Sequence, residues 1–403
     1  MNSGPVAVLF DRFGPYHCAR LRAAARGMDI VALELCGRSQ YADWESVDTG
    51  GAFARVTLFP DRDGSSLSAG ECRREVFAVL DTQSPAAVAV PGWGSTAARA
   101  ALSWCAERGR PAVVMSESTA WDKTRFPGKE AVKRRVVRRG CAAGLVGGQP
   151  QARYLADLGM VPAKIFQGYD VVDNDHFVVR ADAARADADA RRVALGLPGR
   201  YLLTVCRLAV EKNLLRLVEA YAAYRAGVGP GEALALVILG EGPLRTPILS
   251  RCRSPGLEGS VLLPGFKQYD ELPAYYALAD GFVLPSIAEP WGLVVNEAMA
   301  CGLPVLVSER CGCAADLVAA GDNGWTFDPH DLSAIAAGLR RLAGLSAAER
   351  TAMGRRSRER IARWSPQLFA ESLRQAVALA LSATERRTGR MDRWLFRGLA
   401  LLP

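Results

Sequence analysis

The chain has 403 residues, of which 50% are hydrophobic and 23% are charged, and its formal net charge is +8. This composition is globular and excludes a disordered chain, and the length predicts two or three domains. The positive charge favours anionic partners without naming one. No apolar run approaches the ~18 residues of a membrane-spanning helix, and the first residues lack the basic region of a signal peptide.

The ten cysteines include no CxxC pair, and only Cys311 and Cys313 lie close together in the sequence. A chain long enough to bury a full core has little need of a disulfide scaffold. With three histidines in total, it also offers few candidate zinc ligands. We therefore expect most of these thiols to be buried and reduced, in a cytoplasmic protein.

Short apolar runs alternate with helical stretches over residues 1–165. Strands are predicted at 5–10, 30–35, 54–59, 86–90, 111–115 and 142–146, and helices at 68–81, 95–107 and 128–139. Such alternation is typical of a mainly parallel sheet covered by helices on both faces. It predicts an N-terminal α/β domain of the Rossmann type.

Residues 166–195 are polar and turn-rich at first and then helical, and we interpret them as an interdomain linker. A second alternating series predicts another α/β domain over residues 196–365, with strands at 201–206, 234–239, 261–263, 281–285 and 304–308. Two such domains would enclose a cleft at the carboxyl ends of their strands, where ligands bind. Residues 331–381 are predicted to be almost entirely helical, with a break only near Pro366.

The densest functional pattern is EPWGLVVNEAMACGLPVLVS, residues 289–308. Pro290 and Gly292 keep Glu289 on a loop, a helix is expected to begin near Val294, and Glu297 falls in its first turn. The free N–H groups of residues 292–294, together with the helix dipole, would stabilise a diphosphate. Carboxylates beside them could accept hydrogen bonds from sugar hydroxyls.

This string resembles the retaining glycosyltransferases of family 4, the glycosyl transferases group 1, whose hallmark is a Glu, seven residues and a second Glu. The segments CRLAVEKN, GEGPL and LPGFKQYDELPAYYALADGFVLPS match in the family's order, at residues 206–213, 240–244 and 263–286. The resemblance implies the α/β GT-B fold, which has two facing Rossmann-like domains and a central cleft. Residues 1–165 would bind the acceptor and 196–365 the donor, and 366–403 would form a C-terminal crossover helix with a basic, apolar tail.

The resemblance also implies roles for single residues. Arg207 and Lys212 would bind the donor diphosphate, and such fixed cations would neutralise a departing diphosphate. Glu297 would hold the ribose hydroxyls, and Gly265 and Phe266 would lie beside the base. The donor sugar would be held by Glu289, Pro290, Trp291, Gly292, Leu293 and Val294. The alternatives are a helix-start glutamate for Glu297, a solvated loop residue for Glu289, and plain surface cations for Arg207 and Lys212.

In the first domain, the loop FGPYH offers His17, which could orient a sugar or acceptor hydroxyl in catalysis or could simply be structural. Gly14 would let the backbone approach the donor. Many relatives place a His after a later strand, where this chain has VVMSEST, so Glu117 occupies that position. Glu117 could bind acceptor or donor hydroxyls, or cap the next helix. Trp121 could stack on an acceptor sugar ring or belong to the core.

We therefore expect a bacterial-type enzyme that transfers a sugar from a UDP- or GDP-sugar to a saccharide, lipid-linked or small natural-product hydroxyl, with retention. No cofactor or metal is expected, because Arg207, Lys212 and the helix start can carry the leaving-group charge. The acidic triplets 61–63, 173–175 and 187–189 lie away from the donor segments. Alternative hypotheses are a nucleotide-sugar hydrolase or epimerase, and a catalytically silent, membrane-associated scaffold that binds a nucleotide sugar.

Two further segments could bind a partner such as a membrane or an acidic acceptor. Residues 129–139 (KEAVKRRVVRR) carry six basic residues against Glu130, and the tail 385–403 mixes arginines with Trp394 and Phe396. The basic helix could be a solvated face, a surface for anionic lipids on the inner face of the membrane, or a site for an acidic acceptor. The tail could be an interfacial anchor or a closing helix on the first domain. No nucleic-acid-binding motif is found.

Overall fold

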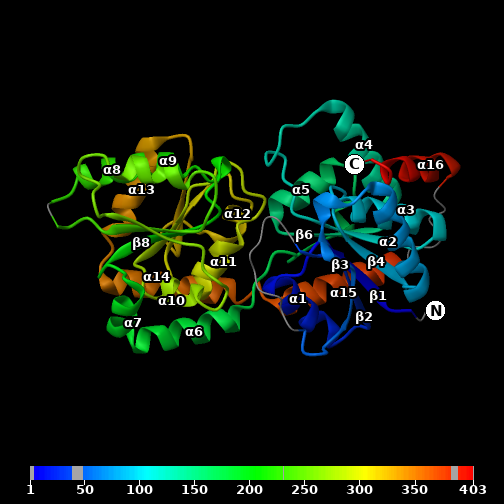
Figure 1. Ribbon diagram of the computed structural model, residues 1–403, viewed down its shortest axis with the longest axis horizontal. Helices are drawn as coiled ribbons and strands as arrows, with labels where there is room; N and C mark the ends of the chain where they lie inside the picture. Colours follow the sequence, from blue (N-terminus) through cyan, green and yellow to red (C-terminus); the bar gives the residue numbers. More distant parts are fainter. Residues whose placement is uncertain (1–3, 39–48, 230, 383–388, 403) are drawn as a thin grey trace. The chain divides into compact units, whose positions relative to one another are not determined.

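The computed structural model describes residues 4–38, 49–229, 231–382 and 389–402. The chain forms two compact units. The first comprises Met1–Ala120, Thr124–Val171 and Ser365–Pro403, and the second comprises Trp121–Lys123 and Val172–Trp364. In each unit, helices cover both faces of a central sheet (Figure 1).

The first unit is built on seven parallel strands in the order β3-β2-β1-β4-β5-β6-β7. The central strands are buried on both faces and are therefore continuous apolar runs such as VAVLF. The strands are β1 (Val6–Phe10), β2 (Ile30–Arg38), β3 (Ala54–Asp63), β4 (Ala87–Pro91), β5 (Ala112–Ser116), β6 (Ala143–Val146) and β7 (Ile165–Gln167).

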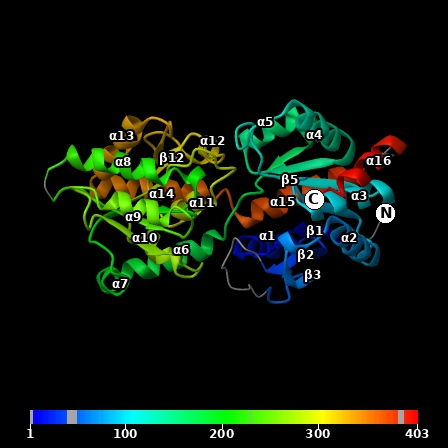
Figure 2. The same cartoon turned by 45° about the horizontal axis from the view of Figure 1, so that its top comes forward.

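Two groups of helices bury the first sheet. One face packs against α2 (Ala69–Gln83), α3 (Thr96–Arg108), α4 (Pro127–Gly140) and α5 (Gln149–Asp157). The other face is covered by α1 (Pro15–Ala25) and α15 (Pro366–Ser382). The last helix, α16 (Arg390–Leu399), packs against α3 (Figure 2). The C-terminal segment thus returns to the unit in which the chain begins.

The second unit has six parallel strands in the order β10-β9-β8-β11-β12-β13. Its first strand, β8, lies between β9 and β11, so the chain turns to opposite sides of β8 in succession. Such a switch point is where ligands bind in open α/β sheets. The strands are β8 (Tyr201–Val205), β9 (Ala235–Leu239), β10 (Val261–Gly265), β11 (Gly281–Leu284), β12 (Val305–Ser308) and β13 (Gly324–Phe327).

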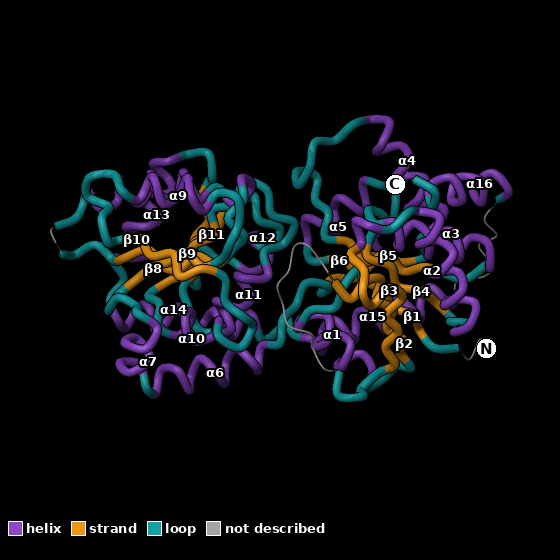
Figure 3. The backbone as a smooth tube through the Cα atoms, viewed as in Figure 1, coloured by secondary structure: helices purple, strands orange, loops and turns teal. Residues whose placement is uncertain are grey.

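The second sheet also lies between two helical layers, with strands central and helices outside (Figure 3). One face packs against α8 (Leu214–Ala226), α9 (Arg245–Cys252) and α13 (Leu332–Ala343). The remaining helices are α6 (Asn174–Ala186), α7 (Ala188–Leu195), α10 (Leu272–Ala277), α11 (Leu293–Ala300), α12 (Ala314–Leu317) and α14 (Ala347–Ile361). In the described ranges, no helix combines the length and the hydropathy needed to cross a bilayer.

Residues 166–195, the predicted linker, hold the end of β7 and all of α6 and α7, and their role as a linker stays a prediction. Elsewhere the structure differs from the sequence-based expectation in two elements. The segment 331–381 is largely helical and breaks before Pro366 as predicted, but it has a second break that was not predicted, because α13 ends at Ala343 and Ser346 starts a new helix as an N-cap. Strand β13 was not predicted, since its four residues are only partly buried.

Candidate active site

The candidate site lies at the carboxyl edge of the second sheet, beside its switch point. Lys212 ends the short 3₁₀ helix η3 (Val210–Lys212), which follows β8, and Glu289 lies on the loop between β11 and α11. Because β8 and β11 are parallel neighbours, the loops that follow them leave the same edge of the sheet. The sequence thus brings a cation and an anion 77 positions apart into contact.

Lys212 and Glu289 form an ion pair, in which the lysine Nζ donates to Oε2 of the glutamate. The Ser286 hydroxyl donates to the same oxygen at 3.3 Å. Both charged side chains are largely buried, at 16% and 12% exposed. Burial by itself would lower the pKa of Lys212, but the adjacent Glu289 carboxylate outweighs it and the pKa is raised. The ammonium is therefore fully charged at neutral pH.

Neighbouring loops fix the backbone around this ion pair. The Ile287 N–H donates to the Glu211 carbonyl at 2.9 Å, and the Gly312 N–H donates to the Glu289 carbonyl at 3.0 Å. Asn213 adopts a left-handed conformation, with φ +57°, immediately after Lys212. Its side-chain amide donates to the carbonyls of Pro285 and Pro329, at 3.2 and 2.9 Å. The loops after β8, β11, β12 and β13 are thus joined by hydrogen bonds.

Helix α11 begins beside Glu289, at Leu293 rather than at the predicted Val294. Gly292 caps it with φ +105°, a conformation that disfavours any side chain. A Cβ at this position would also lie 3.0 Å from the Leu284 Cδ2. The amides that start this helix have no preceding turn to bond, so they can donate to an anion at the positive end of the dipole.

The prediction that Glu297 lies in the first turn of this helix was wrong. Because α11 starts at Leu293, Glu297 is its fifth residue and is completely buried. The hydroxyl of Tyr276, in α10, donates to its Oε2 at 2.7 Å. The role of Glu297 in holding ribose hydroxyls stays a prediction. One oxygen of its carboxylate already accepts a hydrogen bond from Tyr276.

The predicted donor-sugar residues around Glu289 differ in exposure. Pro290, Leu293 and Val294 are partly exposed, whereas Trp291 is only 2% exposed. Its indole N–H donates to the Asn296 Oδ1 at 2.9 Å, and its ring centroid lies 5.2 Å from that of Trp364. The indole therefore belongs to the core, and a donor contact remains a prediction only for the Trp291 main chain.

Arg207 follows β8, Gly265 ends β10 and Phe266 follows it, so all three share the carboxyl edge with Lys212. The Arg207 side chain is half-exposed and donates to the Glu211 Oε1 at 2.6 Å. Gly265 has φ +88°, and its carbonyl accepts the Gly240 N–H at 3.0 Å. The guanidinium lies at the surface of this edge, whereas the Lys212 ammonium is largely buried.

His17 and Gly14 lie together in the first unit, at the start of α1. The Gly14 N–H donates to the His17 Nδ1 at 3.0 Å, and the imidazole centroid lies 4.3 Å from that of Phe10. Burial, helped by the nearby Arg20 guanidinium, lowers the pKa of His17 to about 3. A neutral ring that accepts at Nδ1 carries its proton on Nε2. His17 can therefore donate a hydrogen bond to a ligand oxygen.

This arrangement predicts a specific acid sensitivity. A histidine whose pKa is lowered on folding costs stability as the pH falls below its unfolded value of 6.5, down to the folded value of about 3. We expect the unfolding free energy to drop by roughly 2 kcal/mol more in the wild type than in His17→Gln between about pH 6.5 and 4.5. Glutamine preserves the bond to Gly14, and urea unfolding at both pH values measures the difference. Identical losses would contradict this account.

Glu117 and Trp121, the predicted acceptor residues, fall in different units. Glu117 is exposed, directly after β5, and together with burial it raises the pKa of Asp170. Trp121 belongs to the second unit, where its indole N–H donates to the Arg310 carbonyl at 3.1 Å. The Arg310 guanidinium lies 5.6 Å from the Trp121 ring centroid. Trp121 is thus held by the loop after β12.

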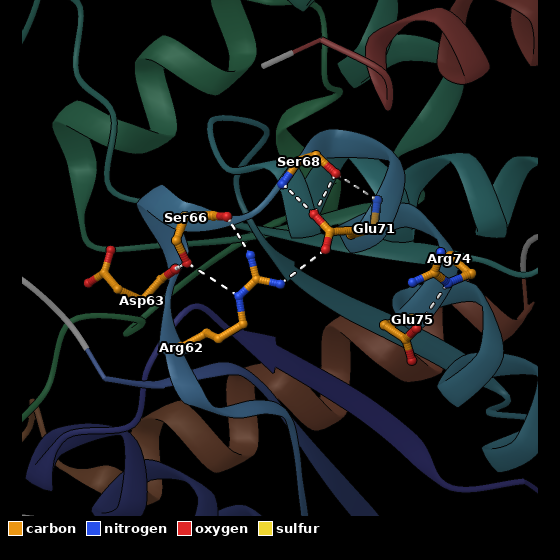
Figure 4. A network of polar contacts seen from close by, with 7 residues as sticks. All are labelled: Arg62, Asp63, Ser66, Ser68, Glu71, Arg74 and Glu75. Atoms are coloured by element: carbon orange, nitrogen blue, oxygen red, sulfur yellow. Dashed lines mark hydrogen bonds and ion pairs between the residues drawn. The ribbon is translucent and has the colours of Figure 1, made fainter.

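The acidic triplet at 61–63 is engaged in structural contacts (Figure 4). Arg62 pairs with Glu71 at 3.0 Å and donates to the Ser66 hydroxyl at 3.4 Å. Asp63 caps a 3₁₀ turn. Hydrogen bonds from Ser68 and Arg62 lower the pKa of Glu71 to about 2. Within the described ranges, no three His, Cys, Asp or Glu side chains are grouped to hold a metal, and independence from metal stays a prediction.

The sequence matches to known proteins include a family model that falls within the second unit. The family model described as glycosyl transferases group 1 matches residues 187–360. Over these residues, the chain is similar to the glycosyl transferases group 1. The 2-deoxystreptamine glucosyltransferase of Streptomyces kanamyceticus is 31% identical over 199 residues, 49% of each chain. Glycogen synthase of Mycobacterium tuberculosis is 36% identical over 178 residues, 44% of this chain and 42% of that protein. The chain thus spans about half the length of these curated relatives.

Solved structures extend the likeness to both units. The Anabaena protein HepE, crystallised with UDP and glucose, has a TM-score of 0.71 at 15% identity, over 93% of this chain and 99% of that chain. Sucrose-phosphate synthase from Thermosynechococcus elongatus has a TM-score of 0.69 at 19% identity, over 92% and 98%. At such identities the likeness concerns the fold, and it confirms the predicted α/β GT-B class.

The segment that the family model matches contains every predicted donor residue except Gly14. Three residues that the sequence analysis missed support these donor residues. Ser286 contacts Glu289, Asn213 fixes the loop after Lys212, and Tyr276 holds Glu297. Ser286 and Asn213 each lie within three positions of a predicted residue, which is the only signal they carry. Tyr276 could not be paired with Glu297 before the packing of α10 near α11 was known.

Proposed function

We propose that this protein transfers a hexosyl group from a UDP- or GDP-sugar to a hydroxyl acceptor, with retention of the anomeric configuration. The observation that carries the proposal is the buried Lys212–Glu289 pair beside the start of α11, within a group 1 domain. A carboxylate that can accept from sugar hydroxyls stands next to a fixed cation and a helix N-terminus. A carboxylate for the sugar hydroxyls, and a cation and a helix N-terminus for the diphosphate, are the groups that would bind a nucleotide sugar.

In the proposed reaction, the bond between the anomeric carbon and the diphosphate oxygen breaks, and the acceptor oxygen bonds to that carbon on the same face. The acceptor proton passes to the departing phosphate oxygen. The Lys212 ammonium and the first amides of α11 stabilise the charge that develops on the diphosphate. Arg207 can turn from Glu211 to the same phosphates, and Glu289 orients the sugar. His17 can donate to a ligand hydroxyl from Nε2.

The names of related proteins support a nucleotide-sugar donor. HepE was crystallised with UDP and with UDP-glucose, and the Streptomyces relative is named a glucosyltransferase. For the acceptor we propose a saccharide, a lipid-linked sugar or a small natural product. We also propose a cytoplasmic location, because all ten cysteines are free thiols and eight of them are buried.

Thermal unfolding with UDP, GDP, ADP and their sugars tests the proposal. A ligand at about 100 times its Kd stabilises the folded state by ~2.7 kcal/mol, so one nucleotide family should raise the Tm. The stabilising sugar nucleotide is then incubated with and without candidate acceptors. Diphosphate release without acceptor would favour a hydrolase, and binding without turnover would favour the silent scaffold. A Tm unchanged by all of these ligands would overturn the donor assignment.

A further inference from the structure

Helix α16 is fastened to the first unit along one side. Phe396 is buried, and Asp392 pairs with Arg135 of α4 at 2.9 Å. Arg397 pairs with Glu107 of α3 at 3.0 Å. The helix therefore packs against α3 and is joined to α4 by an ion pair, and Figure 2 shows it beside α3.

The exposed side of α16 carries two large apolar side chains among its arginines. Met391 and Trp394 are 75% and 72% exposed, and Leu402, beyond the helix end, is 50% exposed. Residues three and four apart share one side of a helix, which puts Met391 and Trp394 together. The buried residues Asp392 and Phe396 are spaced by four on the other side. A helix that only closed the domain would carry polar residues outward.

Exposed cations accompany these apolar side chains on the same two packed helices. Arg390 and Arg393 on α16, and Arg134 and Arg139 on α4, are all exposed. In the part of the chain that the structure describes, no acidic side chain pairs with these four arginines. The nearby acids Asp392, Glu107 and Glu130 are already paired with other cations. The net charge of the exposed face is therefore strongly positive.

We propose that this α4–α16 surface, defined by Arg134, Arg139, Arg390, Met391, Arg393 and Trp394, binds an anionic lipid bilayer. Helix α16 would lie in the interfacial plane, with Met391 and Trp394 among the acyl chains and the arginines at the phosphates. A tryptophan suits this depth because its ring is apolar and its N–H is polar. A basic helix with an apolar outward side is the combination that peripheral membrane proteins use.

Vesicle flotation of the full chain tests this surface. We expect recovery with vesicles containing about 30% phosphatidylglycerol, little recovery with pure phosphatidylcholine, and weaker binding at high salt. Arg134→Gln with Arg139→Gln should weaken binding about 25-fold, since each surface cation contributes about fivefold. Trp394→Ser with Met391→Ser should lower recovery further. The matched controls, Arg191→Gln and Val193→Ser on the exposed face of α7, should bind like the wild type.

Two results would overturn the proposal. One is equal recovery with neutral and anionic vesicles. The other is no recovery at all, together with a concentration-dependent dimer in light scattering that Trp394→Ser abolishes, which would make the apolar side an interface between copies. Because vesicle binding needs neither donor nor acceptor, its failure is distinct from failure of the proposed transfer reaction. The Tm shift by nucleotides is measured on the same variants. It shows whether each variant is folded and binds the donor, independently of vesicle binding.

Discussion

We expect Lys212→Ala to lower the kcat of sugar transfer by about 100-fold, the usual cost of removing one preorganised donor from a developing oxyanion. The lysine is held by Glu289, whose carboxylate also accepts from Ser286, before any ligand arrives, so its charge needs no reorganisation during the reaction. Glu289→Ala should lower kcat by more than about tenfold, because it frees Lys212 and removes an acceptor for sugar hydroxyls. Steady-state kinetics with saturating donor measures both effects.

Removing one partner of a buried pair also destabilises the fold, so stability must be measured with activity. Lys212→Arg keeps the positive charge and should preserve the Tm, while its larger guanidinium restores kcat only in part. Lys164→Ala, in the first unit, is the control and should leave both quantities unchanged. Near-normal kcat in both Lys212→Ala and Glu289→Ala would show that the ion pair does not contribute to catalysis.

The largest loss of stability is expected for Gly240→Ala. Gly240 follows β9 with φ +133°, and a Cβ there would lie 2.0 Å from the carbonyl oxygen of Cys206. Neither backbone can yield easily, because both belong to the carboxyl edge that carries Arg207. We expect the unfolding free energy to fall by at least about 3 kcal/mol.

Gly259→Ala is the matched control for this substitution. Gly259 also has positive φ, at +68°, but no atom lies within 4 Å of its Cβ position. Its substitution should cost only the conformational penalty, about 1–2 kcal/mol. Urea unfolding monitored at one temperature compares the two variants. Equal losses would show that the close approach to Cys206 has no energetic weight.

Most of the strands could be predicted from the sequence because parallel strands buried on both faces are continuous apolar runs. Ala7, Val8 and Leu9 in β1 are all fully buried. Strand β7 escaped prediction because it has only three residues, at the sheet edge. The start of α6 escaped because Asp173, in a polar stretch that reads as a turn, acts as an N-cap.

The candidate site was predictable to a similar degree. Lys212 and Glu289 follow strands at the switch point, so their approach follows from the order of elements. The buried state of Glu297 and Trp291 depends on Tyr276, in α10, and on Trp364, in the turn between α14 and α15. Trp121 follows a strand of the first sheet but packs on Arg310 of the second unit. Such contacts are set by tertiary packing, which local sequence patterns do not encode.

The return of α15 to the first unit has a consequence for how the chain is made. Phe369, Leu373 and Ala376 of this helix are fully buried, and Phe369 lies 6.3 Å from Tyr169. A ribosome delivers them after the whole second unit, so the nascent first unit lacks part of the cover of one sheet face while the rest is synthesised. The second unit, which needs no later residue, can reach its final packing first. Translation therefore ends by completing the domain with which it began.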